Sequence, residues 1–307
     1  MKFLAAAAAL MCWAGAQAQP RAEYPRPQFE RAEWVNLNGE WSYTLDPVKT
    51  GWERGLKDSR GFDGKITVPF APESELSGVG HKEFIPCIWY QREITVPASW
   101  EGKDVLLNFG AVYYESEIYI DGKFVDRHFG GSASFTVYIT KFVKAGGTHS
   151  LVVNAKSDLR GRMQSAGKQS LRHGPFECMY TRTTGIWQTV WMEAVAPSGI
   201  ARVKYVTDID RGEVSMEMTM RRNAAGNELT VSVLDGGKVV ARNTAPVASG
   251  SVVTLPIKKA KLWSPESPFL YDVVFELKDA AGKTVDRAES YFGMRKIHTE
   301  GNKIYLN

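Results

Sequence analysis

Apolar and polar residues alternate with a period of two along much of the chain. Between Val214 and Arg221, Val214, Met216, Met218 and Met220 alternate with polar or charged residues, and Leu229 to Val233 repeats the pattern. This alternation predicts strands with one buried face, which places the methionines in a core rather than in a metal site. No segment shows a sustained 3.6-residue period, so we expect a nearly all-β chain.

The densest apolar stretch runs from Thr184 to Val195 and reads TGIWQTVWMEAV. Aromatic and β-branched residues at this density predict one buried strand. Turn residues follow at 196–199, so we expect a large first domain to close with this strand. The next stretch of roughly 100 residues holds about seven short strand patterns, which is typical of an immunoglobulin-like sandwich.

Two dipeptides predict tight hairpins, because their residues tolerate the positive φ angles that such turns require. Asn38-Gly39 lies inside the aromatic-rich stretch Trp34 to Tyr43, and Asp121-Gly122 joins two apolar runs.

Two polar segments lack this periodicity. Gln19 to Arg31 contains three prolines and is expected to be an extended lead-in. Ser157 to Pro175 is polar and basic, with Arg160, Arg162, Lys168, Arg172 and His173. This second segment is either a solvated surface loop or a rim that meets a substrate or another domain.

Composition excludes some classes of function. Apolar residues make up 44% of the chain and charged residues 23%, with a formal net charge of +4. No run of five like charges occurs, so neither nucleic-acid binding nor a membrane-surface role is supported.

Residues 1–18 have the pattern of a secretory signal peptide. Lys2 precedes an apolar run from Phe3 to Trp13, and Ala16-Gln17-Ala18 forms a small-residue cleavage pattern. The run is shorter than the roughly 20 residues that a membrane span needs. We therefore expect an exported protein, periplasmic or extracellular after cleavage near Ala18.

Cleavage would remove Cys12 and leave Cys87 and Cys178. These two cysteines either form a disulfide in an oxidising compartment or remain as free buried thiols. The five histidines are scattered without the spacing of a zinc site, so we propose neither a metal site nor a cofactor.

Several sequence blocks together resemble glycoside hydrolase family 2, the family of β-galactosidases, β-glucuronidases and β-mannosidases. The blocks run in family order: Asn38–Trp41, Trp89–Pro97, Tyr113–Gly131, Thr184–Val195, Leu262–Val273 and Phe292–Ile297. They cover nearly the whole chain after residue 18.

The resemblance implies a domain order. It assigns residues 19–197 to a jelly-roll sugar-binding domain and residues 198–296 to an immunoglobulin-like sandwich. Residues 297–307 resemble the lead-in to the family's catalytic (β/α)8 barrel. Such a barrel needs about 250 residues with alternating strands and helices, so we expect it to be absent.

The family's retaining mechanism uses two glutamates on barrel strands, about 5 Å apart. No glutamate here takes either role, and we predict no catalytic residue. The carboxylates considered, all attributed to the surface or to loops, are Glu75, Glu83, Glu115, Glu117 and Glu177.

A jelly-roll loop helps to hold the sugar in several members of the family. Galactosidases and glucuronidases carry an aspartate six residues before the glycine of the Gly-Ile-Trp strand, whereas this chain has Met179. The candidate substrate-binding residues on the loop are Arg172, His173, Glu177 and Tyr180. They suit hydroxyl binding and ring stacking; alternatively, Arg172 and Glu177 hold the loop or a domain interface.

The function expected is that of the non-catalytic N-terminal portion of an exported retaining glycoside hydrolase. Its partners would be a carbohydrate, bound through the full-length enzyme, and the missing barrel. The alternatives are a stand-alone carbohydrate-binding protein and a structural or homo-oligomerising module. A bare apolar patch is expected near 157–180 and the C-terminal tail.

Overall fold

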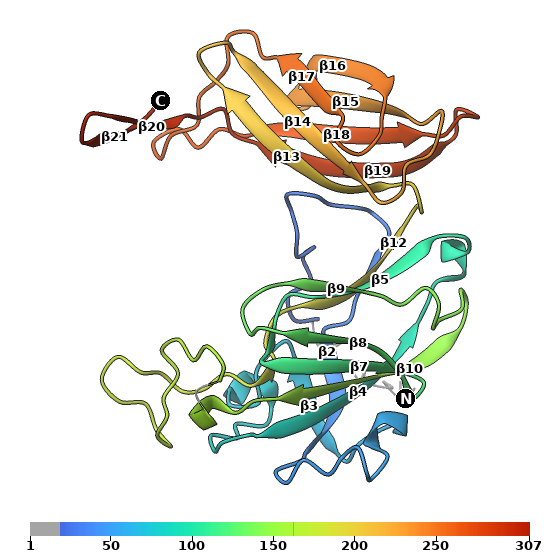
Figure 1. The fold of residues 1–307 in the computed structure, drawn as a ribbon, viewed down its shortest axis with the longest axis vertical. Coiled ribbons are helices and arrows are strands. Elements are labelled where there is room, and N and C mark those ends of the chain that lie inside the picture. The colour runs from blue at the N-terminus through green and yellow to red at the C-terminus, as the bar shows by residue number, and fades with distance from the viewer. Residues whose placement is uncertain (1–18, 162) are drawn as a thin grey trace, which may run out of the picture.

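The computed structural model describes residues 19–161 and 163–307. The predicted signal peptide and Arg162 lie outside these residues. The described chain forms two β-sandwiches, one above the other in Figure 1. Its helices are single 3-10 turns: Leu56–Asp58, Glu75–Ser77, Ala98–Trp100 and Leu159–Gly161. None of the described helices has the length and apolar character needed to cross a membrane.

The first sandwich contains a six-stranded antiparallel sheet with the order β3-β2-β4-β10-β7-β8. Its strands are β3 (Gly64–Val68), β2 (Gly39–Leu45), β4 (Cys87–Thr95), β10 (Thr148–Lys156), β7 (Glu115–Ile120) and β8 (Lys123–Phe129). The opposing sheet is β1 (Trp34–Asn36), β12 (Val190–Val195), β5 (Asp104–Phe109) and β9 (Phe135–Tyr138). A short pair, β6 (Val112–Tyr113) and β11 (Gly185–Ile186), completes this part.

β5 and β12 are buried on both faces, including their polar residues Asp104, Asn108 and Glu193. Every residue of both strands is buried, and Figure 1 shows the two strands between the six-stranded sheet and the second sandwich. Trp41, Leu107 and Phe109 belong to the core between the sheets.

The second sandwich pairs a three-stranded sheet with a four-stranded sheet. The first holds β13 (Ile200–Asp208), β14 (Glu213–Met220) and β17 (Val252–Pro256). The second holds β16 (Lys238–Pro246), β15 (Glu228–Asp235), β18 (Tyr271–Lys278) and β19 (Thr284–Phe292). Met216, Met218 and Met220 are buried in the core between them, as the alternation predicts.

The predicted hairpin at Asn38-Gly39 is wrong. β1 ends at Asn36 and β2 begins at Gly39, and the two strands lie in different sheets, so the chain turns a corner there. Asn38 is buried, and its side-chain oxygen accepts the Val190 N–H at 3.0 Å. By contrast, Asp121-Gly122 is the predicted β7–β8 hairpin, with φ angles of 48° and 75°.

The predicted single strand over Thr184–Val195 is interrupted. β11 ends at Ile186 and pairs with β6, whereas β12 begins at Val190 in the four-stranded sheet. The intervening Trp187 is half-buried and donates its indole N–H to the Gly131 carbonyl at 2.7 Å.

Residues 19–33, called here the lead-in segment, bind the two sandwiches together. Arg31 is 6% exposed and forms a bidentate ion pair with Asp286 of β19, with nitrogen–oxygen distances of 2.9 and 3.0 Å. Its third partner is the Ile200 carbonyl, at 2.6 Å. Burial alone would lower the pKa of Arg31, but the hydrogen bond to Asp286 and the nearby carboxylates raise it overall.

The same segment also binds β12 of the first sandwich. Glu193, fully buried, accepts hydrogen bonds from Tyr24 (3.1 Å), Asn108 (3.0 Å) and Arg26. Arg31 lies 3.7 Å from this carboxylate. One buried network therefore reaches from β12 through the lead-in segment to β19.

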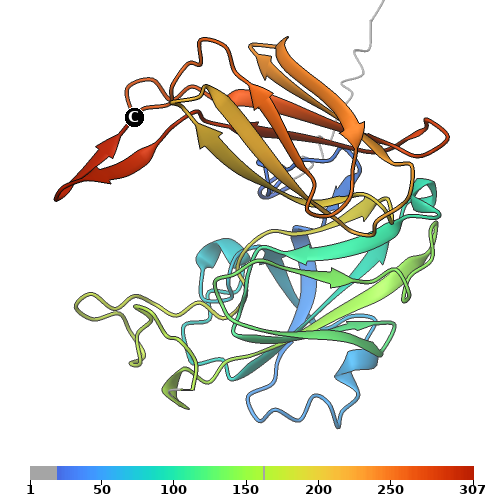
Figure 2. The same ribbon diagram turned by 45° about the horizontal axis from the view of Figure 1, so that its top comes forward.

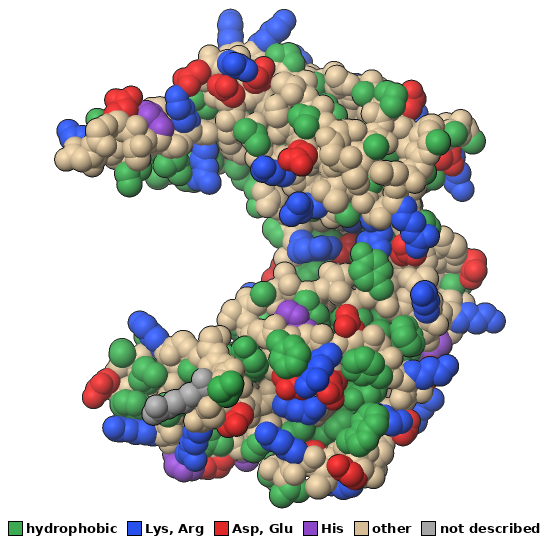
Figure 3. All heavy atoms as spheres, viewed as in Figure 1, with side chains coloured by type: hydrophobic (Ala, Val, Ile, Leu, Met, Phe, Trp, Pro, Cys, Tyr) green, Lys and Arg blue, Asp and Glu red, His purple; other side chains and the backbone are tan. Residues whose placement is uncertain are grey.

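Two projections lie on the same side of the molecule. One is the excursion loop, residues 157–184; the other is the hairpin of β20 (Ile297–Glu300) and β21 (Lys303–Leu306). Figures 1 and 2 both show them extending in the same direction. The space-filling view shows a deep hollow between them (Figure 3).

Candidate functional site

The excursion loop is held at its base by Arg182. This side chain is 4% exposed and donates hydrogen bonds to the carbonyls of Ser170 (3.3 Å) and His173 (3.1 Å). It also donates to the carbonyls of Arg172 and Lys82. Burial lowers the pKa of this guanidinium, which remains charged because an arginine does not deprotonate in proteins.

Glu73 anchors the end of the excursion loop. Its Oε2 accepts the Thr184 N–H at 3.1 Å, and Oε1 is buried without a partner among the described residues. Burial raises the pKa of Glu73 to about 7, against the opposing effect of the Thr184 hydrogen bonds and the Arg182 charge. An uncharged carboxyl at this position avoids the cost of a buried negative charge.

Gly185 follows at the start of β11, with φ of +69°. A Cβ atom at this position would lie 2.1 Å from the Tyr90 hydroxyl oxygen. Only glycine fits both the backbone conformation and the approach to Tyr90. The glycine of the Gly-Ile-Trp block therefore fixes where the excursion loop rejoins the sheet.

The four predicted substrate-binding residues share the excursion loop but form no enclosed site. All four are exposed, Tyr180 by 63%. Among the described residues, no hydrogen bond or ion pair joins any two of them. His173 pairs instead with Glu83, at 2.6 Å, and the Arg172 guanidinium lies 4.0 Å from the centre of the Phe176 ring. Glu177 has φ of 49° at a turn.

Both cysteines are free in the structure. Cys87 is buried in β4, where burial raises the pKa of its thiol to about 11. Cys178 is exposed on the excursion loop. Within the described residues, no three histidine, cysteine or acidic side chains gather as metal ligands would.

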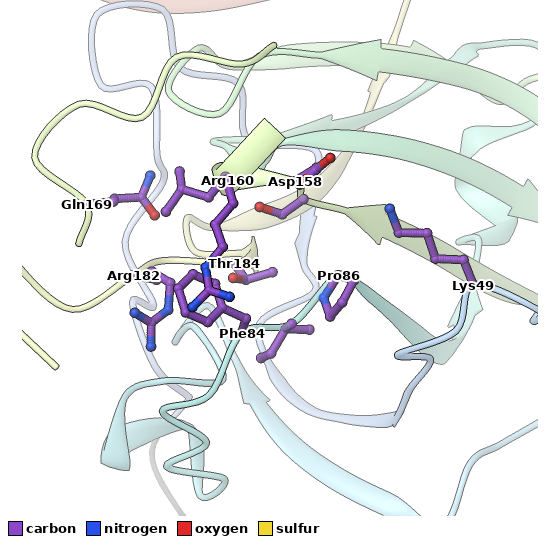
Figure 4. Close-up of a pocket in the computed structure, with 11 residues that line it drawn as sticks. Lys49, Phe84, Pro86, Asp158, Arg160, Gln169, Arg182 and Thr184 are labelled. Carbon is purple, nitrogen blue, oxygen red and sulfur yellow. The ribbon is translucent and has the colours of Figure 1, made fainter. Parts of the chain in front are cut away.

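A cavity at the base of the excursion loop was not anticipated from the sequence (Figure 4). Its volume is about 240 Å³, and its lining includes Lys49, Phe84, Arg160 and Arg182. The basic composition of residues 157–175 had drawn attention to Arg160. Lys49 and Phe84 come from distant segments, which no local pattern connects to the loop.

Comparisons with known proteins identify the fold. The model of the glycosyl hydrolases family 2 sugar-binding domain matches residues 34–164, and a second model of glycosyl hydrolases family 2 matches residues 199–295. The chain belongs to glycosyl hydrolase family 2. The described residues carry the two β-sandwich domains of this family and no catalytic barrel.

Curated relatives in this family are distant and longer. A β-glucuronidase from Paenibacillus borealis is 23% identical over 300 residues, which cover 92% of this chain and 49% of the relative. A β-galactosidase from Thermoanaerobacter pseudethanolicus is 24% identical and is covered over 37% of its length. The chain therefore spans half or less of the length of these two family 2 relatives.

Solved structures agree on the fold. The β-glucuronidase from Ruminococcus gnavus in complex with D-glucaro-δ-lactam has a TM-score of 0.73 at 21% identity, over 91% of this chain and 48% of that one. The β-glucuronidase of Lactobacillus rhamnosus gives 0.72 at 22% identity, with the same coverage. At this identity the likeness concerns the arrangement of the sandwiches alone.

Proposed function

We propose that this chain is the non-catalytic N-terminal portion of an exported retaining glycoside hydrolase. In that role it positions a catalytic barrel and supplies a rim to the sugar site. The supporting observation is the hollow between the excursion loop and the β20–β21 hairpin (Figure 3). A barrel held there would contact both sandwiches, whose relative position the buried lead-in network fixes.

The C-terminal hairpin suits a docking role in this proposal. Ile297, Ile304 and Leu306 are exposed by 63%, 77% and 39%. Apolar side chains on a projecting hairpin are the kind of surface that a neighbouring domain covers. The hairpin would then be the last element before the barrel.

The substrate in this proposal is a β-glycoside. The relatives named above are a β-glucuronidase and a β-galactosidase, which supports a carbohydrate without selecting one. Met179 stands where galactosidases and glucuronidases of the family are expected to carry an aspartate. The proposed polar and aromatic contacts of the rim are Arg172, His173, Glu177 and Tyr180.

Export through the predicted signal peptide completes the proposal. Expression of the full chain in a bacterial host, followed by N-terminal sequencing of the periplasmic product, is expected to give a chain that starts at Gln19. Recovery of only uncleaved chain in the cytoplasm would contradict export.

The activity test uses the chain itself with a panel of aryl β-glycosides. We expect no turnover above that of a heat-treated control, because the described residues form two β-sandwiches and no (β/α)8 barrel, on whose strands the family carries its two glutamates. The matched experiment sequences the gene beyond the Asn307 codon and expresses any in-frame continuation. Turnover by the longer product, and not by this chain, supports the proposal; turnover by this chain refutes it.

A further inference from the structure

The cavity at the base of the excursion loop has walls from separate parts of the first sandwich. They are the segment before β4, the start of the excursion loop, its end, and Lys49 from the loop after β2 (Figure 4). Its volume, about 240 Å³, is below the roughly 300 Å³ at which pockets for drug-sized ligands begin. The cavity therefore suits one monosaccharide unit or a smaller ion.

The charge of the lining is not balanced. Lys49, Arg160 and Arg182 face a single lining carboxylate, Asp158. The Lys49 and Arg160 side chains form no ion pair with any residue that the structure describes, and the hydrogen-bond partners of Arg182 are neutral carbonyls. Burial and the charge of Arg160 lower the Arg182 pKa, whereas the nearby carboxylates Glu73 and Glu83 oppose them, so the cations of the lining without an opposite partner are Lys49 and Arg160.

The neighbouring carboxyls outside the lining, Glu73 and Glu83, act on Arg182 but form no ion pair with Lys49 or Arg160 among the described residues. Glu83 pairs with His173 at 2.6 Å. Glu73 is bound to Thr184 N–H, and its pKa of about 7 leaves it largely uncharged in mildly acidic solution. The charges of Lys49 and Arg160 are therefore available to a ligand.

The donors are held in place. The Arg160 guanidinium lies 3.6 Å from the centre of the Phe84 ring, which fixes its plane while its N–H groups stay free. The Nε atom of Arg182 is buried without a partner among the described residues. Gln169 also lines the cavity, and its side-chain oxygen accepts the Thr183 N–H at 2.9 Å.

These groups match one ligand chemistry. Planar guanidinium groups bind carboxylates with paired hydrogen bonds. The apolar residues Ile85, Pro86 and Leu159 form part of the lining and suit the C–H face of a pyranose ring. We propose that the cavity binds a carboxylate-bearing monosaccharide unit, with Arg160 and Lys49 as its cationic contacts. The sugar assignment rests on the proposed function, whereas the anion assignment does not.

Titration calorimetry on the purified chain at constant ionic strength tests the proposal with three probes: D-glucuronate, D-glucose and inorganic phosphate. We expect glucuronate to bind at least about tenfold more tightly than glucose or phosphate. Equal binding of phosphate would overturn the sugar assignment, and no binding of glucuronate would overturn the site as a whole.

Variants locate the binding. Arg160→Gln and Lys49→Gln remove one charge each from exposed side chains and are expected to weaken glucuronate binding at least about fivefold, while Arg160→Lys retains part of it. Lys123→Gln, an equal charge change on an exposed residue of β8, is the matched control. Unchanged affinity in both cavity variants, with unchanged circular dichroism, would refute the location. None of these measurements requires a barrel, so their failure leaves the proposed function standing.

Discussion

The lead-in segment and the excursion loop are both long, polar stretches outside the large sheets, but different interactions hold them. The lead-in segment binds through charged side chains that are buried on both sides: Arg31 is 6% exposed, Glu193 fully buried and Asp286 6% exposed. The excursion loop is held by Arg182, which is buried and binds backbone carbonyls, while the other charged side chains described in this loop remain in solvent.

The difference concerns which part of each segment is fixed. In the lead-in segment, the side chains of Tyr24 and Arg31 are buried in contacts with the two sandwiches and cannot serve a ligand. In the excursion loop, the backbone is fixed while Arg172, Glu177 and Tyr180 stay exposed. Fixed backbone with free side chains is the arrangement that binding loops need.

Removing the Arg31 charge should have the largest effect. Arg31→Met leaves Asp286 and Glu193 buried without this partner, which typically costs about 3–5 kcal/mol. The measurement is urea unfolding followed by tryptophan fluorescence, with Arg202→Met, an exposed change on β13, as the control. A double variant, Arg31→Met with Asp286→Asn, should be less destabilised than the single one. A loss of unfolding free energy below about 1 kcal/mol in the single variant would show that Arg31 does not hold the two sandwiches together.

Glu73→Gln should change the pH dependence of stability. The raised pKa of Glu73, about 7 against an ordinary 4.5, means that its contribution to stability is complete below about pH 4.5. That contribution is lost as pH rises through 7, by about 3 kcal/mol. The amide keeps the acceptor for Thr184 but cannot ionise. The variant should therefore match the parent in acid and exceed it at pH 8.

The measurement for Glu73 is the unfolding midpoint in urea at pH 5 and pH 8. Glu177→Gln, which removes an exposed carboxylate from the excursion loop that Glu73 anchors, should show no such difference between the two pH values. Parallel pH profiles of the parent and Glu73→Gln would contradict the assignment.

Arg182→Ala should loosen the excursion loop without disturbing the lead-in segment. The variant leaves the carbonyls of Ser170, Arg172, His173 and Lys82 without their donor, at a cost of about 2 kcal/mol. Limited proteolysis with subtilisin should cut within 163–181 at least about tenfold faster than in the parent. Faster cutting within 19–33 as well would show that the two segments are not independent.

Arg172→Ala and Tyr180→Ala should have the smallest effect on stability, within about 0.5 kcal/mol, because both side chains are exposed. Thermal unfolding of the two variants beside the parent checks this. A loss above about 1.5 kcal/mol from either would show that the side chain, and not only the backbone, holds the loop.

The fold follows closely from local patterns. The alternation at Val214–Met220 predicts a strand with one buried face, and Asp121-Gly122 predicts a tight turn; the structure has both. The Asn38-Gly39 hairpin failed for a non-local reason. Asn38 is held by Val190, 152 residues away, so tertiary hydrogen bonds decided the conformation that the dipeptide alone suggested.

The candidate site was less accessible to sequence reasoning. The absence of periodicity identified the excursion loop, and its composition identified exposed polar residues. Neither pattern could identify Arg182 or Glu73 as anchors of the loop, because their partners Lys82 and Thr184 lie 100 and 111 residues away in sequence. Arg31 and Asp286 are 255 residues apart, so no pattern in the neighbouring sequence indicates that they form an ion pair.

That last separation has a consequence for how the chain is made. Asp286 leaves the ribosome 255 residues after Arg31, on the order of 10–50 s later at ordinary rates of translation. During that interval the first sandwich can fold with Tyr24 and Arg26 seated on Glu193, but the Arg31 guanidinium has no Asp286 to meet. Completion of the second sandwich is therefore the step that allows the Arg31–Asp286 ion pair to join the two sandwiches.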